Sequence, residues 1–391
     1  MFTCGPSIYD TPHIGNFRTF LYEDILHRYL QYLGYRVKRL INFTDVEDKA
    51  IHQAREESVS LAELTGHAAD DFYCGAGLLH IRLPDFIPRS TTSVDQAVQL
   101  IMKLLHKGYA YRYKDSIFYD PLKFEEFGKL YGLDMTDWPQ KKRHYWQDTY
   151  SGNRWNLGDF ILWHGYRPER DGSVFWHTTL GRGRPAWNIQ DSAMISKHLG
   201  YEIDISCGGV DNLYRHHDYT IAIMEAVSSK QFSRFWLHGE HVLLEGKKMS
   251  KSKGNILYLS TLSQEGFTGS ALRFYLISEH YRNKLNLTKK SLAASASRCA
   301  DMRQQAAELL QPFTFGAAPA RDADQYIAQI SADFTRHMSD DLQVDKACDS
   351  VEKNLQQLVN LKNKTRLSEK QCQQIKTNLL AIDTVLQVLL P

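Results

Sequence analysis

The sequence predicts an α/β protein with a Rossmann-like parallel sheet, an inserted subdomain and an all-α C-terminal helical bundle. Strand-like and helix-like segments alternate over residues 1–113 and again over 191–244, as expected where helices connect parallel strands. Residues 114–185 interrupt this alternation with an aromatic, glycine-rich stretch that has no regular period. From residue 292 onward, apolar side chains recur at helical spacing.

The first α/β segment opens with a short apolar strand at residues 2–4, followed by a loop and a helix over 14–33. Residues 35–41 alternate between polar and apolar side chains and predict a second strand. A loop leading into a helix follows at 45–54, then a helix at 95–107 and a strand at 109–113. We therefore assign residues 1–95 to the first half of an α/β domain.

The irregular stretch contains five tryptophans and predicts a separate subdomain over residues 96–185. Alternation resumes with a helix at 191–199, a strand at 202–206, a helix from about 216 and a strand at 241–244. Residues 186–247 are thus the second half of the α/β domain. Residues 248–290 form a loop and a connecting region, and residues 291–391 form the helical bundle, with a linker at 313–322.

The composition excludes several classes of protein. A hydrophobic content of 43% and a charged content of 24% are those of an ordinary globular protein, and the net charge of +2 indicates no general basic surface. The six cysteines have no paired spacing, which argues against a disulfide framework. Without a long apolar run or a signal pattern, we expect a cytoplasmic protein with no membrane partner. The oligomeric state is not predicted.

Two short runs, HIGN at residues 13–16 and KMSKS at residues 248–252, carry most of the chemical information. Attack of a carboxylate on the α-phosphate of ATP builds negative charge, which positioned cations stabilise. Lys248 and Lys251 supply two such cations on one loop. Met249 would anchor that loop in an apolar socket, and Ser250 and Ser252 provide polar turns. Either run alone is more often an ordinary turn or a solvated loop; together they predict ATP binding.

Three further positions suit a nucleotide. His13 falls at a turn into a helix N-terminus, where free backbone N–H groups attract anions. Gly15 leaves room for close approach of the nucleotide. Gly209 and Asp211 follow a predicted strand, and a glycine turn with a carboxylate suits ribose hydroxyls.

These runs resemble the ATP-binding motifs of class I aminoacyl-tRNA synthetases, which implies a Rossmann-like sheet of the HUP type. The match is closer to cysteinyl-tRNA synthetases and the cysteine ligase of mycothiol biosynthesis. It covers residues 4–10, 42–49, 184–194, 216–217, 248–252, 280–282 and 334–341. The resemblance implies that His13, Asn16, Lys248 and Lys251 act in catalysis. It also implies an amino-acid pocket formed by Cys4, Gly5, Thr44, Trp187, Asp191, His216 and Thr220.

The metal-ligand positions depart from the family. The family holds zinc with two cysteines, a histidine and a glutamate; here these positions are Cys4, Asp191, His216 and Thr220. A Cys4, Asp191 and His216 zinc site with an open position remains chemically possible, but threonine is a poor ligand, and we expect no metal. Without zinc, the carboxylate of Asp191 favours an amino acid other than cysteine. Two other residues are alternative ligands: Cys207 and Asp218.

We therefore expect an adenylate-forming ligase that uses ATP and Mg²⁺ to activate an amino acid. Residue 391 falls about where the bundle should end, and we expect no anticodon-binding domain. The first hypothesis is accordingly aminoacyl transfer to a small-molecule amine. The first alternative is aminoacylation of the acceptor end of tRNA, and the second is a non-catalytic binding protein. The intact His13, Lys248 and Lys251 argue against the second alternative.

Overall fold

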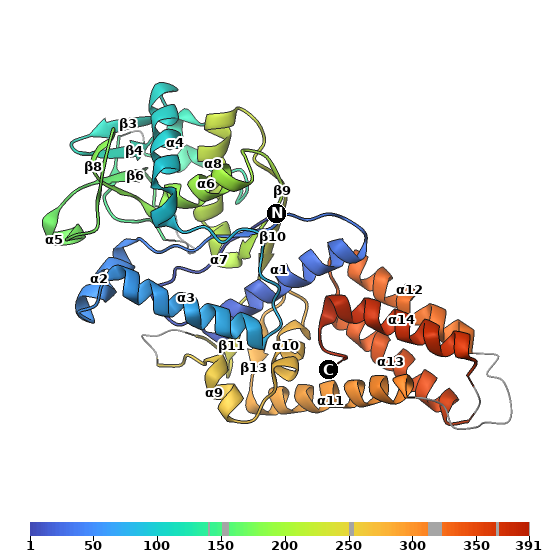
Figure 1. Cartoon of the computed structure of the whole chain (residues 1–391). Coiled ribbons are helices and arrows are strands. Elements are labelled where there is room, and N and C mark those ends of the chain that lie inside the picture. The colour runs from blue at the N-terminus through green and yellow to red at the C-terminus, as the bar shows by residue number, and fades with distance from the viewer. Residues whose placement is uncertain (140, 151–155, 250–253, 312–322, 365–366, 391) are drawn as a thin grey trace. The chain divides into compact units, whose positions relative to one another are not determined.

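The chain forms two compact units, each described here by itself. The computed structural model describes residues 1–391 except 140, 151–155, 250–253, 312–322, 365–366 and 391. Unit 1 comprises residues 1–12, 38–73 and 83–238, and unit 2 comprises residues 13–37, 74–82 and 239–391 (Figure 1). The five-part division expected from the sequence is finer than this one and stays a prediction.

Unit 1 contains the predicted parallel sheet. Strand β1 (Phe2–Thr3) lies between β2 (Leu40–Ile41) and β9 (Ile203–Gly209) and is parallel to both, and β10 (Ser233–Gly239) lies beyond β9. The prediction of the second strand over residues 35–41 was wrong about its length. Only Leu40 and Ile41 are buried and paired, whereas Tyr35 is 63% exposed, so alternation alone does not make a strand without a neighbour.

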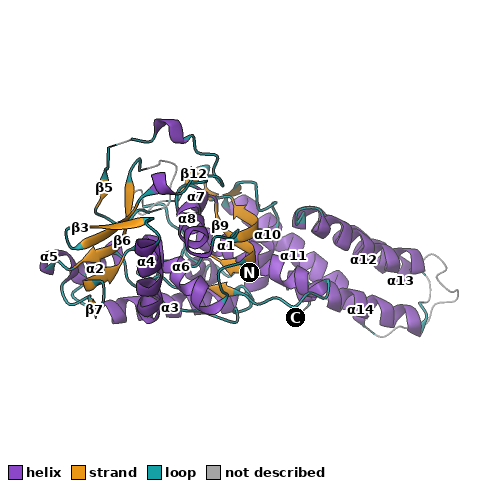
Figure 2. Cartoon of the chain, turned by 90° about the horizontal axis from the view of Figure 1, so that it is seen from above, coloured by secondary structure: helices purple, strands orange, loops and turns teal. Residues whose placement is uncertain are grey.

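The inserted stretch forms a mostly antiparallel sheet in the order β3-β4-β6-β8-β7. Its strands are β3 (Ala110–Tyr113), β4 (Ser116–Tyr119), β6 (Asp159–Gly165), β7 (Trp176–Thr178) and β8 (Gly181–Pro185), and β5 (His144–Tyr145) pairs with β6. Helix α4 (Val94–His106) lies beside this sheet (Figure 2). The sequence predicted a subdomain here and the strand at 109–113, which is β3, but not the other strands, because aromatic and glycine residues obscure the two-residue period.

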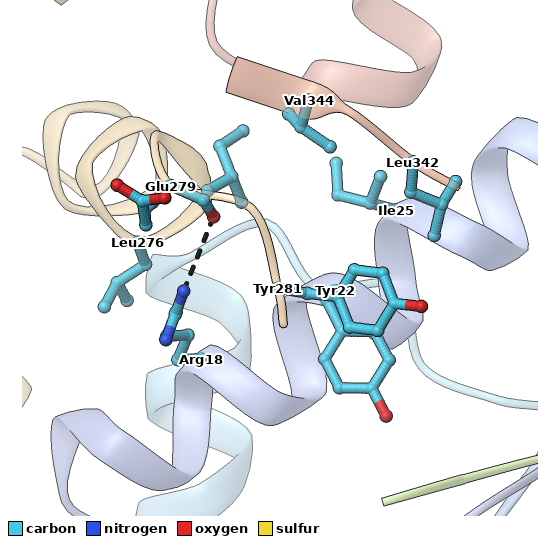
Figure 3. A pocket seen from close by; sticks show the side chains of 9 residues that line it. Arg18, Tyr22, Ile25, Leu276, Glu279, Tyr281, Leu342 and Val344 are labelled. Carbon is cyan, nitrogen blue, oxygen red and sulfur yellow. Dashed lines mark hydrogen bonds between the residues drawn. The ribbon is translucent and has the colours of Figure 1, made fainter. Parts of the chain in front are cut away.

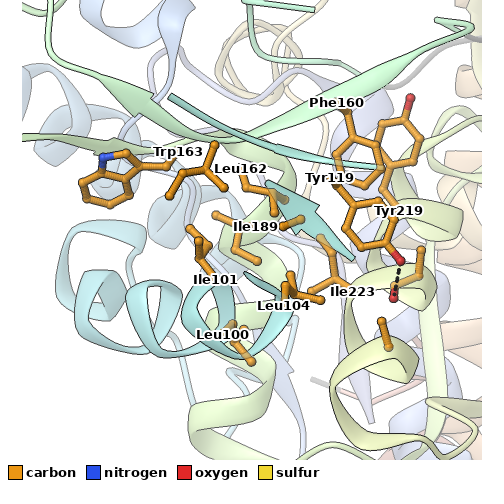
Figure 4. Close-up of a cluster of buried hydrophobic side chains, with 14 of the residues drawn as sticks. Leu100, Ile101, Leu104, Tyr119, Phe160, Leu162, Trp163, Ile189, Tyr219 and Ile223 are labelled. Atoms are coloured by element: carbon orange, nitrogen blue, oxygen red, sulfur yellow. Dashed lines mark hydrogen bonds between the residues drawn. The ribbon is translucent and has the colours of Figure 1, made fainter. Parts of the chain in front are cut away.

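A single apolar core joins the insertion to the helices of unit 1. Side chains from α4, α6 (Trp187–His198) and α8 (His216–Ser228) meet those of β4 and β6 (Figure 4). Phe160 and Tyr219 stack with ring centroids 4.0 Å apart. Residues 187–195 of α6 are all buried, so this helix is enclosed rather than amphipathic. The buried helix brings Trp187 and Asp191 into the interior.

Unit 2 begins with α1 (Ile14–Tyr32), which starts in the HIGN run. A small sheet places β11 (Val242–Leu244) between β13 (Leu285–Leu287), which is parallel to it, and β12 (Lys247–Lys248), which is antiparallel. Helices α9 (Leu259–Gln264) and α10 (Gly269–Ile277) lie between β12 and β13 in the sequence. The first lysine of the KMSKS run is therefore on an edge strand.

Four helices confirm the predicted helical region at the end of the chain. They are α11 (Lys289–Leu310), α12 (Ala323–Ser339), α13 (Val344–Lys362) and α14 (Glu369–Leu386), drawn in orange to red in Figure 1. Helix α12 packs against α13 and α14, and α11 packs against the same two helices. The fully buried Arg273 of α10 ties this bundle to α1 through an ion pair with Asp24 and a hydrogen bond to the backbone oxygen of Leu386. The expected linker at 313–322 lies outside the described residues.

The remaining helical segments include α2 (Asp48–Glu56), which the sequence predicted within 45–54, and others that it did not predict. The others are α3 (Leu61–Leu78), α5 (Pro168–Asp171), α7 (Val210–Leu213) and the 3-10 turns Ser90–Ser93, Pro121–Lys123 and Met135–Asp137. Within the described residues, no helix combines the length and the apolar character needed to cross a membrane.

Candidate active site

Three residues from distant parts of the sequence form a buried cluster in unit 1. Cys4 follows β1, Asp191 lies on α6, and His216 opens α8; their exposed fractions are 9%, 1% and 0%. Cys4 Sγ lies 3.7 Å from both Asp191 Oδ2 and His216 Nε2, and the last two atoms are 2.8 Å apart. We call these residues the Cys-Asp-His cluster. The sulfur, carboxylate oxygen and ring nitrogen of these residues therefore lie close together, as the resemblance implied.

Neighbouring groups fix the orientation of the cluster. Asn42 donates from Nδ2 to Asp191 Oδ1 at 2.9 Å and accepts from the backbone N–H of Gly5 at 2.8 Å. A Cβ at Gly5 would overlap with the backbone oxygen of Asn42, so only glycine permits this approach. The Trp187 indole stacks on the His216 ring with centroids 4.2 Å apart. The sequence did not single out Asn42, although it lies in the matching run 42–49.

The donor set of the cluster fits zinc. Thiolate, imidazole and carboxylate ligands lie about 2.0–2.3 Å from zinc, so tetrahedral geometry separates two ligand atoms by about 3.3–3.8 Å. The two distances from Cys4 Sγ fall in this range, and the shorter distance between His216 and Asp191 is that of a hydrogen bond. Zinc sites that act on a substrate use three protein ligands, which is the number that this cluster supplies. The distances within the cluster therefore argue against the expectation, made from the sequence, that no metal is bound.

The other proposed pocket residues lie near the cluster or are engaged elsewhere. The Thr220 hydroxyl donates to the backbone oxygen of His216 in its own helix. Thr44 is buried, and its hydroxyl accepts from Asn42 Nδ2 at 3.4 Å. Asp218 accepts from the backbone N–H groups of Leu130 and Tyr131. Among the described residues, the Cys-Asp-His cluster includes neither of the two alternative ligands, Asp218 and Cys207.

A second histidine lies directly behind the cluster. His217 Nδ1 and His238 Nε2 are 2.8 Å apart, so one ring donates to the other. Burial, and then the neighbouring His238 and His216, lowers the pKa of His217 well below its ordinary value. His217 is therefore neutral at physiological pH, which adds no positive charge beside a metal position.

A second group with a metal-like spacing, Asp48, Asp148 and His164, is an ion-pair network instead. The buried guanidinium of Arg184 forms ion pairs with Asp48 and with Asp148, whose carboxylate also pairs with His164. Although burial opposes ionisation, His164 and Arg184 hold the pKa of Asp148 well below its ordinary value. The fixed positive charge of Arg184 occupies the place that a cation would take. Asp148 Oδ1 also accepts from the backbone N–H of Trp187 and so supports the start of α6.

The predicted nucleotide residues of unit 2 form a helix N-terminus. His13 is the N-cap of α1: its Nδ1 accepts from the backbone N–H of Gly15 at 3.0 Å. Asn16 completes a capping box, since its Oδ1 accepts from the backbone N–H of His13 at 2.9 Å. A Cβ at Gly15 would lie 3.0 Å from Met249 Cε. The HIGN and KMSKS runs therefore approach each other at Gly15, 234 positions apart in the sequence.

The lysine loop is described in part. Lys248 lies on β12, and its Nζ is 3.2 Å from His241 Nε2. Met249 is 7% exposed, in agreement with the apolar anchor expected from the sequence. Ser250, Lys251 and Ser252 lie outside the described residues.

The predicted ribose-binding residues lie in unit 1 at the end of β9. Gly209 is the N-cap of the short helix α7, and Asp211 lies in its first turn. The sequence predicted a strand at 202–206 and then a glycine turn; the strand instead continues to Gly209, and α7 follows it directly. The ribose role itself stays a prediction.

This fold and the paired nucleotide runs define a class of protein. A family model described as tRNA synthetases class I (C) catalytic domain matches residues 1–297. Methionyl-tRNA synthetase from Mycobacterium tuberculosis, solved with methionyl-adenylate, superposes with a TM-score of 0.69 and 14% identity over 99% of this chain and 89% of its own. Agrobacterium radiobacter LeuRS, in a complex titled LeuRS-tRNA-LeuAMS, gives a TM-score of 0.71 with 12% identity over 100% and 84%. At such identities the structures show the fold alone. The protein is a class I aminoacyl-tRNA synthetase-type ligase.

Curated relatives identify the branch. Cysteine–tRNA ligase from Chlamydia pneumoniae is 38% identical over 390 residues, which cover 100% of this chain and 82% of the relative. The protein of the same name from Protochlamydia amoebophila is 34% identical over 394 residues and is covered to 81%. The chain belongs to the cysteinyl-tRNA synthetase family.

Proposed function

We propose that this protein activates cysteine with ATP and transfers it to the acceptor end of tRNA. The Cys-Asp-His cluster carries the proposal for the amino acid, because its thiolate, carboxylate and imidazole are a zinc donor set with an open position. The names of the relatives, cysteine–tRNA ligase, favour tRNA over the small-molecule amine that the sequence suggested first. Class I activation of an amino acid is shared by both alternatives.

Each residue has a physical role in this proposal. Cys4, Asp191 and His216 would hold zinc, and Asn42 would keep the Asp191 carboxylate oriented. When bound, zinc selects a substrate thiolate over a hydroxyl because sulfur is the softer ligand. The packed Trp187 ring would hold His216 in place and exclude water from the cluster.

The nucleotide residues act by position and charge. The N-terminus of α1, capped by His13 and Asn16, presents backbone dipoles that favour the phosphates of ATP. Gly209 and Asp211 would meet the ribose. Lys248 and Lys251 would stabilise the charge that builds as the amino-acid carboxylate attacks the α-phosphate and pyrophosphate leaves, with Mg²⁺ on the phosphates.

Pyrophosphate exchange against all twenty amino acids, with metal analysis of the same preparation, tests the amino acid. We expect exchange with cysteine and about one zinc ion per chain, both reduced in Asp191→Asn. Strong exchange with another amino acid and no zinc would restore the expectation that Asp191 binds a cationic or hydrogen-donating side chain.

The acceptor is tested separately. Total tRNA and a panel of small amines are each incubated with enzyme, ATP and the activated amino acid. We expect aminoacylated tRNA and no amide product; amide formation without charged tRNA would refute the tRNA proposal.

A further inference from the structure

The turn between α12 and α13 in unit 2 has an unusual backbone. Asp341 and Leu342 both adopt positive φ, 52° and 54°, although neither is glycine. A left-handed conformation costs about 1–2 kcal/mol for each such residue. Contacts of the turn must compensate for this cost. The sequence matched this turn to the family without giving it a role.

The side chain of Asp341 makes those contacts with residues 280–282. Asp341 Oδ1 accepts from the Tyr281 hydroxyl at 2.7 Å, and Oδ2 accepts from Arg282 Nε at 2.7 Å. Arg282 Nη2 adds a second bond to Oδ1 at 3.1 Å. His280 Nδ1 accepts from the backbone N–H of Arg282, so its Nε2 donates to the backbone oxygen of Asp341. The Asp341 carboxylate therefore holds Tyr281 and Arg282, and the backbone oxygen of the same residue holds His280.

The held segment is in turn joined to α1 by a buried arginine. Arg18 is 3% exposed, and Figure 3 shows its guanidinium beside Glu279. It donates to four backbone oxygens that precede the parallel strands β11 and β13: those of Glu240, His241, Glu279 and His280. The backbone N–H of Glu240 also donates to the Tyr281 oxygen at 2.8 Å. Residues 240–241 and 279–281 are thus fixed together.

Apolar packing around Tyr281 does not by itself fix the position of residues 280–282. Tyr22 of α1 stacks on Tyr281 with ring centroids 5.0 Å apart. Next to this pair, a cavity of about 20 Å³ is lined by α1, α10, Tyr281, Leu342 and Val344 (Figure 3). A volume of this size holds one or two water molecules at most, so it is no substrate site. Because a small space remains unfilled here, the polar contacts of Asp341 and Arg18 add to packing in holding the segment.

Residues 240–241 are in turn connected to Lys248, the first lysine of the KMSKS run. His241 follows Glu240, and its Nε2 lies 3.2 Å from Lys248 Nζ. The next residues form β11, in which Leu243 pairs with Lys248 of β12. The position of residues 240–241 therefore affects Lys248 in two ways. One is the backbone pairing of β11 with β12, and the other is the contact of the His241 imidazole with the lysine.

We propose that Asp341 is a positioning residue for Lys248, acting through residues 280–282, Arg18 and His241. This inference rests on the proposed activation of an amino acid with ATP. A lysine that stabilises charge in a transition state must be held to a fraction of an ångström, since a misplacement of about 1 Å costs on the order of a hundredfold in rate. The helical bundle thereby contributes to the chemical step from a turn that has no part in binding substrate.

The test is a double-mutant cycle measured by pyrophosphate exchange. Asp341→Gly removes the carboxylate and fits the positive φ, so the turn keeps its conformation. We expect kcat to fall about tenfold with less than a twofold change in KM for ATP, and Asp341→Asn to restore part of the loss. In a Lys248→Ala background, Asp341→Gly should change kcat less than twofold, because the group it positions is absent. The matched control is Asp340→Gly, whose side chain contacts Gln343, and it should behave as wild type.

Two kinetic results would overturn the inference. One is a full tenfold loss that recurs in the Lys248→Ala background, and the other is an equal loss in Asp340→Gly. Amide hydrogen exchange in residues 242–248 supplies a readout that needs no activity: Asp341→Gly should exchange faster there than Asp340→Gly, and equal exchange would also overturn it. Absence of pyrophosphate exchange in the wild type with every amino acid would refute the proposed function, while hydrogen exchange still decides the role of Asp341.

Discussion

Replacing Glu47 by glutamine removes a buried acid whose pKa lies near neutrality. Glu47 is 0% exposed, and burial, followed by the negative charge of Asp148, raises its pKa from 4.5 to about 7. An acid with a raised pKa in the folded state stabilises the fold while it is protonated. Stability therefore decreases as the pH rises from about 4.5 to about 7 and then levels off.

The magnitude follows from the width of that interval. About 2.5 pH units, at about 1.36 kcal/mol each, amount to at most about 3 kcal/mol lost by the wild type above pH 7. A glutamine at position 47 is uncharged at every pH, so the variant does not lose this stability as the pH rises. For a unit of this size, about 1 kcal/mol shifts Tm by about 2–4 °C. We expect Glu47→Gln to raise Tm by up to about 10 °C at pH 8 and by little at pH 5.

Thermal unfolding of both proteins between pH 5 and pH 8 measures this difference. Glu57→Gln is the matched control, since Glu57 is exposed nearby, just after α2. Its Tm should follow that of the wild type at every pH. A Tm difference between Glu47→Gln and wild type that is the same at pH 5 and pH 8 would refute the reasoning, because it would not arise from ionisation of Glu47.

Three further predictions concern the nucleotide elements, unit 2 and the metal. Gly15→Ala places a methyl group 3.0 Å from Met249 Cε and should raise KM for ATP about tenfold in pyrophosphate exchange; an unchanged KM would contradict the close approach of these elements. Arg273→Met removes the fully buried partner of Asp24, which keeps only the ion pair with the less buried Arg28, and should cost about 3 kcal/mol in urea unfolding, whereas the exposed Arg336→Met should cost less than about 1 kcal/mol. Removal of zinc with a strong chelator should lower both Tm and cysteine-dependent exchange, and metal restoration should recover both; insensitivity of both would argue against zinc at the Cys-Asp-His cluster.

Local patterns explain which parts of the fold were predictable. The helices that begin at Ile14, Val94 and His216 were predicted to within a few residues, although only the helix at Val94 has a clear apolar face. The strand expected at 35–41 shrank to Leu40–Ile41, because pairing requires a neighbour that the local sequence does not specify. Apart from β3, predicted at 109–113, the strands of the insertion were missed because aromatic residues occupy both faces of that sheet.

The candidate site was predictable only through its resemblance to a family. Cys4, Asp191 and His216 were named together, and the structure brings them together. Their separation in the sequence gives no periodic pattern from which contact could be derived. The supporting role of Asn42 depends on one hydrogen bond across 149 positions, and no local rule predicts such a bond.

The sequence by itself determined the class of protein and the helical region at its end, because short runs of residues resemble those of one family and apolar residues recur at helical spacing. Only the tertiary structure decided how the replaced ligands behave. Asp191 turns its carboxylate toward Cys4 and His216, while Thr220 bonds to its own helix. Side-chain direction depends on packing and on competing hydrogen-bond partners, and those partners are brought together only when the chain folds.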